Sequence, residues 1–130
     1  MGVTDDENQQ KEVFQNEEKQ DELNKPLGMQ GGLTPQNKEF LEFVMGLIKG
    51  EKINLYAPSS LLNDEVYNTL DEKKQGEVDM EAVNSLAALR DIKGLYMAGY
   101  TDTYQMENLV DKLRLAKEKF EEKYGDVFII

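Results

Sequence analysis

The strongest constraint on the fold is the spacing of apolar residues over the last quarter of the chain. They recur at steps of three and four residues, the period of an α-helix with one apolar face. Asp102 with Gln105 has the spacing of a capping box and predicts where this helix begins, and Gly125 predicts where it ends. The apolar positions are Met106, Leu109, Leu113, Ala116, Phe120 and Tyr124, with Val110 beside them.

A second helix is predicted over residues 35–49. Thr34 is suited to cap it, Pro35 to occupy its first turn, and Gly50 to end it. Its apolar residues cover about 200° of the helical wheel, more than one buried face needs. We therefore expect this helix to be central or to contact another chain. These apolar residues are Phe40, Leu41, Phe43, Val44, Met45, Leu47 and Ile48.

The segment between residues 51 and 99 is less regular. Residues 52–58 alternate in polarity, which predicts a brief strand or extended chain. A short helix follows, beginning near Ser59 or Asn63, and residues 71–76 form a polar break. Asp79 then caps a helix that runs to about Ala98. Apolar residues expected to face inward are Leu62, Val66 and Leu70 in the short helix, and Ala82, Leu86, Leu89, Ile92 and Tyr96 in the long one.

These patterns predict an all-α fold, a small three- to four-helix bundle in which the last two helices form an antiparallel hairpin. Residues 1–33 differ, because they hold eight acids against three lysines and few apolar residues. Such a composition buries too little apolar surface to offset the entropy of folding. The predicted domains are a disordered acidic tail, 1–33, and a helical bundle, 34–130.

The C-terminal segment 127–130 supports two hypotheses. It is a free apolar peptide for a partner, or it packs on the bundle by a minimal two-stranded pairing with residues 53–56. Leaving its side chains in water would forfeit about 1.5–3 kcal/mol each. We therefore expect packing.

Composition excludes several kinds of chemistry. The chain has no Cys and no His, which excludes disulfides, thiolate metal sites and histidine-based catalysis. Its formal net charge of −11 disfavours direct nucleic-acid binding. A loop at 71–82 has the length of a calcium loop, but Lys73 and Ala82 occupy positions that need oxygen ligands. We expect no catalytic constellation, metal or cofactor.

No apolar run is long enough for a membrane span, and the first residues do not form a secretory signal, so a cytoplasmic location is expected. The leading hypothesis is a non-enzymatic helical protein that binds another protein, with a homodimer left open. The alternatives are a partner or regulator of a nucleic-acid-binding protein, acting as an acidic mimic, and a small enzyme using only Asp, Glu, Lys or Tyr. Candidate interaction residues are Arg90, Lys93, Leu95, Tyr100, Tyr104 and Leu115.

Overall fold

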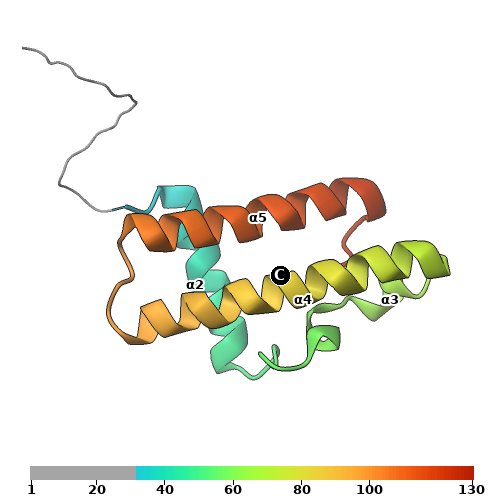
Figure 1. The fold of residues 1–130 in the computed structure, drawn as a ribbon, viewed down its shortest axis with the longest axis horizontal. Helices are drawn as coiled ribbons and strands as arrows, with labels where there is room; N and C mark the ends of the chain where they lie inside the picture. The colour runs from blue at the N-terminus through green and yellow to red at the C-terminus, as the bar shows by residue number, and fades with distance from the viewer. Residues whose placement is uncertain (1–31) are drawn as a thin grey trace, which may run out of the picture. The chain divides into compact units, whose positions relative to one another are not determined.

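The computed structural model describes residues 32–130, so nearly all of the predicted acidic tail lies outside the described residues. The described chain is all-α, as predicted, and no strand occurs within it. Its elements in order are α2 (Pro35–Lys49), the 3-10 helix η1 (Pro58–Leu61), α3 (Asp64–Tyr67), α4 (Glu72–Met97) and α5 (Tyr104–Tyr124). Figure 1 shows α4 and α5 side by side as an antiparallel hairpin, with α2 running across the pair.

Helix α4 is longer than the sequence predicted, with 26 residues. It is capped by Asp71, whose carboxylate accepts a hydrogen bond of 2.9 Å from the amide of Lys74, and not by Asp79. The predicted polar break is therefore the first turns of the helix. Gly76 costs about 1 kcal/mol relative to Ala within a helix. The residues around it favour helix, and Val78, which is fully buried, anchors this end to the core.

The ends of the other two long helices lie where their local signals indicated, with one correction. Thr34 caps α2, and Gly50 follows its last residue. Gly125, with a positive φ of 83°, ends α5. The N-cap of α5 is Thr103, whose hydroxyl accepts a hydrogen bond from the amide of Met106, and not Asp102. The Asp102 carboxylate instead accepts a hydrogen bond from the amide of Leu33, across 69 residues of sequence.

Helix α2 is joined to α5 by a buried amide. The Asn37 side chain is 1% exposed. Its Nδ2 donates to Glu107 at 2.8 Å and to Asp111 at 3.2 Å, and its Oδ1 accepts from Nε of Arg114 at 2.7 Å. The apolar arc of α2 is only partly covered, since Leu41, Val44 and Met45 are buried while Phe43 remains 49% exposed.

The segment between α2 and α4 does not contain the brief strand, but short helical turns begin at both of the predicted starts, near Ser59 and at Asn63. Residues 52–57 form turns in which Ile53 and Leu55 are buried and Tyr56 is 82% exposed. Pro58 then starts η1, and α3 is a separate single turn. The most deeply buried residue of this segment is Leu61, because η1 directs it inward, whereas Leu62, Val66 and Leu70 are half-buried.

The C-terminal segment is packed, as expected, but on a different partner. Val127, Phe128 and Ile130 are buried. The amide of Ile129 donates to the carbonyl of Leu61, and the amide of Asn63 donates to the carbonyl of Val127, each at 2.8 Å. A single antiparallel bridge joins residues 62 and 128. The predicted pairing with residues 53–56 is wrong, because the turns that bury Ile53 and Leu55 leave that segment no extended edge.

Replacing Asn37 by Ala leaves Nε of Arg114 without its acceptor. It also removes one donor each from Glu107 and Asp111, which keep their hydrogen bonds from the Thr34 amide and from Arg114. We expect the free energy of unfolding to fall by roughly 2–3 kcal/mol, the cost of unsatisfied buried polar groups. Chemical denaturation measures the change. Asn108→Ala, on the exposed side of α5, is the matched control and should change stability little; equal losses in the two variants would contradict the role given to Asn37.

Phe128→Ala and Phe43→Ala form a second matched pair. Phe128 is 7% exposed and its ring lies 5.8 Å from that of Phe120, whereas Phe43 is half exposed. Truncation of a buried Phe costs about 3–5 kcal/mol. The exposed position should cost less than about 1 kcal/mol. Thermal unfolding of both variants tests this, and a small loss for Phe128→Ala would show that the C-terminal segment contributes little.

Candidate protein-binding surface on α4 and α5

Helix α4 has uncharged residues on two opposite faces. One face is in the core and carries the buried residues Val78, Ala82, Ser85, Leu86, Leu89 and Ile92. On the outward side, Met80 is 70% and Val83 52% exposed, and Ala87 and Gly94 are also exposed. A surface helix ordinarily carries charged residues opposite its buried face. The outward face of α4 is therefore suited to being covered by a segment of another protein.

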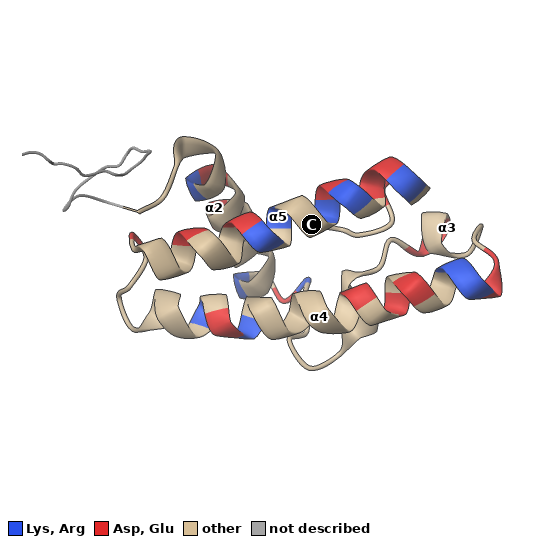
Figure 2. Ribbon diagram, turned by 45° about the horizontal axis from the view of Figure 1, so that its top comes forward, with Lys and Arg blue, Asp and Glu red and all other residues tan. Residues whose placement is uncertain are grey.

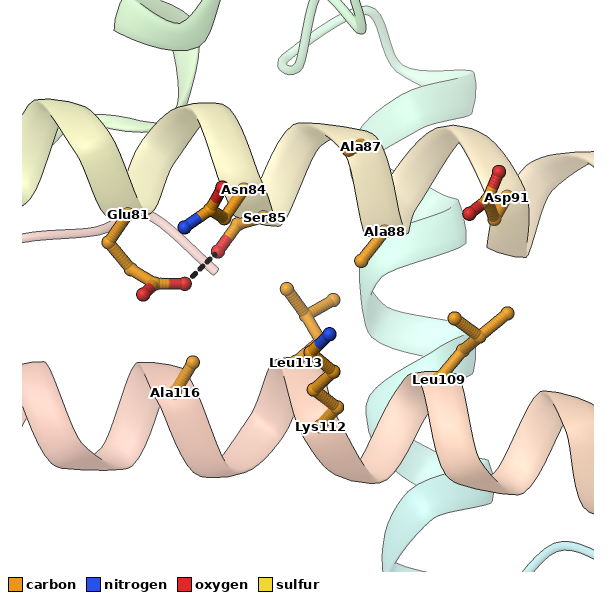
Figure 3. Close-up of a pocket in the computed structure, with 10 residues that line it drawn as sticks. All are labelled: Glu81, Asn84, Ser85, Ala87, Ala88, Asp91, Leu109, Lys112, Leu113 and Ala116. Carbon is orange, nitrogen blue, oxygen red and sulfur yellow. Dashed lines mark hydrogen bonds between the residues drawn. The ribbon is translucent and has the colours of Figure 1, made fainter.

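A groove runs between α4 and α5 beside this face, with a volume of about 440 Å³. Its floor and walls hold Ser85, Ala88, Ala116, Leu109 and Leu113, and Figure 3 shows these side chains in the space between the two helices. The small side chains at these facing positions leave the space open. We call this hollow and its continuation, described next, the α4–α5 groove.

The groove continues toward the hairpin turn. A second hollow of about 520 Å³ is lined by Arg90, Gly94, Leu95, Gln105 and Asn108, and it shares Asp91 and Leu109 with the first. A Cβ atom added at Gly94 would have no other atom within 4 Å. The surface at this position is therefore open, and a side chain introduced there would not disturb the fold.

Charges of opposite sign border the two sides of the groove. Glu81 and Asp91 stand on the α4 side, and Lys112 stands on the α5 side (Figure 3). The hydroxyl of Ser85 donates to the Glu81 carboxylate at 3.1 Å, which satisfies this buried polar group. The groove is thus lined mainly by uncharged residues, with Glu81 and Asp91 on its α4 border, Lys112 on its α5 border, and Arg90 on the α4 border near the hairpin turn.

The structure brings together only some of the residues proposed from the sequence. Arg90 and Leu95 line the α4–α5 groove. Lys93 lies on another side of α4, where it lines a hollow with Ile53 and Tyr56. The remaining three are exposed and line none of these hollows: Tyr100 and Tyr104 at 58% each, and Leu115 at 51%.

Sequence reasoning missed the outward residues Met80, Val83, Ala87 and Gly94. A signal was present, because their steps of three, four and seven place them on one helical face opposite the core stripe. Ala and Gly are ordinary helix residues on a periodicity plot, however, and only the neighbouring α5 shows that Ala87 and Gly94 line a groove, whereas Met80 and Val83 lie outside its lining.

Titratable groups with shifted pKa values lie outside the groove. Hydrogen bonding to Asp79, with burial, raises the pKa of Tyr67, and hydrogen bonding to Glu77 raises that of Tyr124. Burial disfavours the charge of Arg114, but hydrogen bonds to Glu118 and Asp111 outweigh it and raise its pKa. Each shift has a local structural cause.

Among residues 32–130, no group of three or more Asp, Glu, His or Cys side chains is arranged to hold a metal ion. In the same range, no helix combines the length and the apolar character needed to cross a membrane.

Comparisons of the chain with protein-family models, with curated proteins and with solved structures found no match. The surfaces of the described residues are therefore the basis for the function proposed below.

The hydrogen bond between Tyr124 and Glu77 gives a pH prediction. It lowers the pKa of Glu77 below its ordinary 4.5; burial opposes this effect and Lys123 adds to it. Tyr124→Phe should raise the pKa of Glu77, as measured by NMR titration of its carboxyl carbon. A lowered pKa in the folded state stabilises above the ordinary pKa, and this stability is lost as pH falls through the folded value. Acidification from pH 7 to pH 3 should therefore destabilise Tyr124→Phe less than the parent protein.

Tyr67→Phe is the control for this titration, because Tyr67 bonds to Asp79 and not to Glu77. An unchanged Glu77 pKa in Tyr124→Phe would contradict the assignment.

Proposed function

We propose that this chain is a non-enzymatic cytoplasmic protein that acts by binding another protein, and that the α4–α5 groove holds an amphipathic helix of that partner. The observation that carries the proposal is the second uncharged face of α4, which lies beside an open groove of small residues. A helix seated there would cover Ala87 and Gly94, the residues of this face that line the groove.

A helix suits this groove better than an extended strand. Two antiparallel helices with small residues between them let a third helix approach closely and complete a layer of bundle packing. Amphipathic helices bind such grooves through apolar residues spaced three, four and seven apart. Because Ala87 and Gly94 are seven residues apart on α4 and line successive parts of the groove, apolar residues of the partner at the same spacing can pack against both.

The border charges specify the chemistry of the partner. Glu81 and Asp91 favour basic residues on the side of the partner helix that lies over α4, and Lys112 favours acidic residues on the side over α5. Such pairs at the edge of an interface contribute more to orientation and specificity than to affinity. The expected partner is therefore an amphipathic helix with a small apolar face, one basic edge and one acidic edge.

The enzyme alternative has less support. An active site requires titratable groups gathered in a hollow with their pKa values tuned to the reaction. The shifted tyrosines and Glu77 form hydrogen-bonded pairs outside the groove. The alternative of an acidic mimic of nucleic acid is also less supported, because the exposed face of α4 beside the groove is uncharged.

A site-specific photo-crosslinking experiment tests the proposal with the full chain. Benzoylphenylalanine at Asn84, an exposed residue that lines the groove, should give an adduct with the partner in cells of the source organism, while the same group at Leu115 should give none. Ala87→Arg and Gly94→Arg should remove the Asn84 adduct and weaken binding of the identified partner at least tenfold, about 1.4 kcal/mol. Gln36→Arg, at an exposed position of α2, adds the same charge and should change neither.

Thermal unfolding of each variant confirms that the fold is retained. Adducts that persist in both arginine variants, or that form equally from Leu115, would contradict the proposal. An adduct formed with a second copy of this chain would replace the separate partner by a homodimer.

A further inference from the structure

A second surface lies on a different side of α4, and its chemistry differs from that of the α4–α5 groove. It is a hollow of about 410 Å³ between the end of α2, the turns that follow it, and α4. Its lining residues are Ile48, Glu51, Ile53, Asn54, Leu55, Tyr56 and Lys93, so one acid and one base face the hollow. We call it the Tyr56 pocket. It combines an apolar floor, an exposed aromatic ring and a lysine.

The turns that present Tyr56 are held by their own hydrogen bonds. The amide of Tyr56 donates to the side-chain carbonyl of Asn54 at 2.9 Å, and the amide of Asn54 donates to the Ser60 hydroxyl at 2.9 Å. That hydroxyl lies 2.7 Å from the Ala57 carbonyl, to which it donates. The Tyr56 ring is nevertheless 82% exposed. The backbone therefore holds an aromatic side chain in solvent at a defined position.

Arg90 fixes the other side of this ring. Its Nη1 donates to the carbonyl of Leu55 at 2.7 Å, and its guanidinium lies 5.6 Å from the centre of the Tyr56 ring. These contacts orient the guanidinium and leave further N–H donors available, because arginine has five. An arginine held in place loses less entropy when it binds a carboxylate.

Cations gather around the pocket in an otherwise acidic chain. Lys49 lies 5.6 Å from the centre of the Tyr96 ring, and Lys52 follows it in sequence. Figure 2 shows the blue segments at and after the end of α2 beside blue segments in the C-terminal half of α4. Within the described part of the chain, none of Lys49, Lys52, Arg90 and Lys93 has a carboxylate oxygen within 4.0 Å.

This absence of carboxylate partners distinguishes the cluster from the cations of α5. Arg114 is paired with Asp111 and Glu118, and Lys117 is paired with Glu121. Lys49 and Arg90 instead contact aromatic rings, and Arg90 also contacts a backbone carbonyl. Glu51 lines the same pocket but forms no ion pair within 4.0 Å with a described residue, so the four cations exceed the acid of the lining. A carboxylate from another molecule can supply what they lack.

We propose that the Tyr56 pocket binds an acidic peptide segment of a partner protein that contains an aromatic or aliphatic side chain. That side chain rests against Ile53 and Tyr56, and flanking carboxylates pair with Arg90 and Lys93. The pocket is short and the surrounding chain carries an acid excess. A nucleic-acid backbone, which needs a longer basic surface, fits it less well than a short peptide. Arg90 borders both this pocket and the α4–α5 groove, but the contacts proposed here do not require the groove to be occupied.

Titration of the 15N-labelled full chain tests the proposal. The probe is a fluorescein-labelled peptide, Asp-Glu-Phe-Glu-Asp-Leu-Glu-Glu, at low salt. We expect shifts of the amide signals of residues 53–56 and 90–93, and saturable binding by fluorescence anisotropy. The variants Tyr56→Ala and Lys93→Glu should each weaken the affinity by tenfold or more. Lys119→Glu changes charge identically at an exposed position of α5 and should change it less than threefold.

Two outcomes would overturn the assignment. One is absence of binding, or equal weakening by Lys119→Glu, which would indicate only a general effect of charge. The other is tighter binding of a single-stranded oligonucleotide at the same amides. Ala87→Arg, in the groove, should leave binding of the peptide unchanged, so failure here and failure of the proposed function are separable.

A further experiment tests whether the acidic N-terminal residues of the same chain occupy the Tyr56 pocket. Because the chain has no Cys, Gln10→Cys allows a single nitroxide label in the full-length protein. The proposal predicts that, in dilute samples without probe, the label leaves the amide signals of residues 53–56 at full intensity. Selective attenuation of these signals would overturn the proposal of a separate partner in favour of an internal contact.

Discussion

The hydrogen bonds of Asn37 fix the position of α2 on the helical hairpin. Its side chain is 1% exposed and meets Glu107, Asp111 and Arg114, all on α5. Buried polar groups require their partners, so α2 cannot slide or rotate on α5 without leaving an amide and a guanidinium unsatisfied. The apolar residues Leu41, Val44 and Met45 then face the core. Because α2 covers one side of the hairpin, the opposite side, with the α4–α5 groove, remains open.

Helix α4 carries both candidate surfaces because it contacts different neighbours on its two sides. Where α4 faces α5, Ser85 and Ala88 of α4 and Ala116 of α5 have side chains too small to fill the space between the two helices. Toward the turns after α2, Lys93 and Arg90 meet Tyr56 and the carbonyl of Leu55. One surface is apolar and bordered by charge, and the other is cationic and aromatic. They are suited to different partner chemistries.

Much of the helical architecture could be predicted because helix ends depend on local interactions. Thr34 and Gly125 act within one turn of their own position, so their signals are complete in the sequence. The start of α4 was harder, because Asp71 and Asp79 are both competent caps. The choice depends on whether Val78 finds a core to enter. The cap of α5 was missed by one residue, since Asp102 is engaged by the amide of Leu33 from far away in the chain.

Periodicity, capping and composition are local properties, so the order of the residues is enough to predict the all-α class, the hairpin of the last two helices and the absence of His and Cys chemistry. The pairing of residues 127–130 with residues 61–63 follows only from the folded chain. The same holds for the groove that the outward face of α4 borders, and for Arg90, which joins Tyr56 from 34 residues away. Each of these depends on which distant segments meet, and that is set by burial and hydrogen bonding of the whole core.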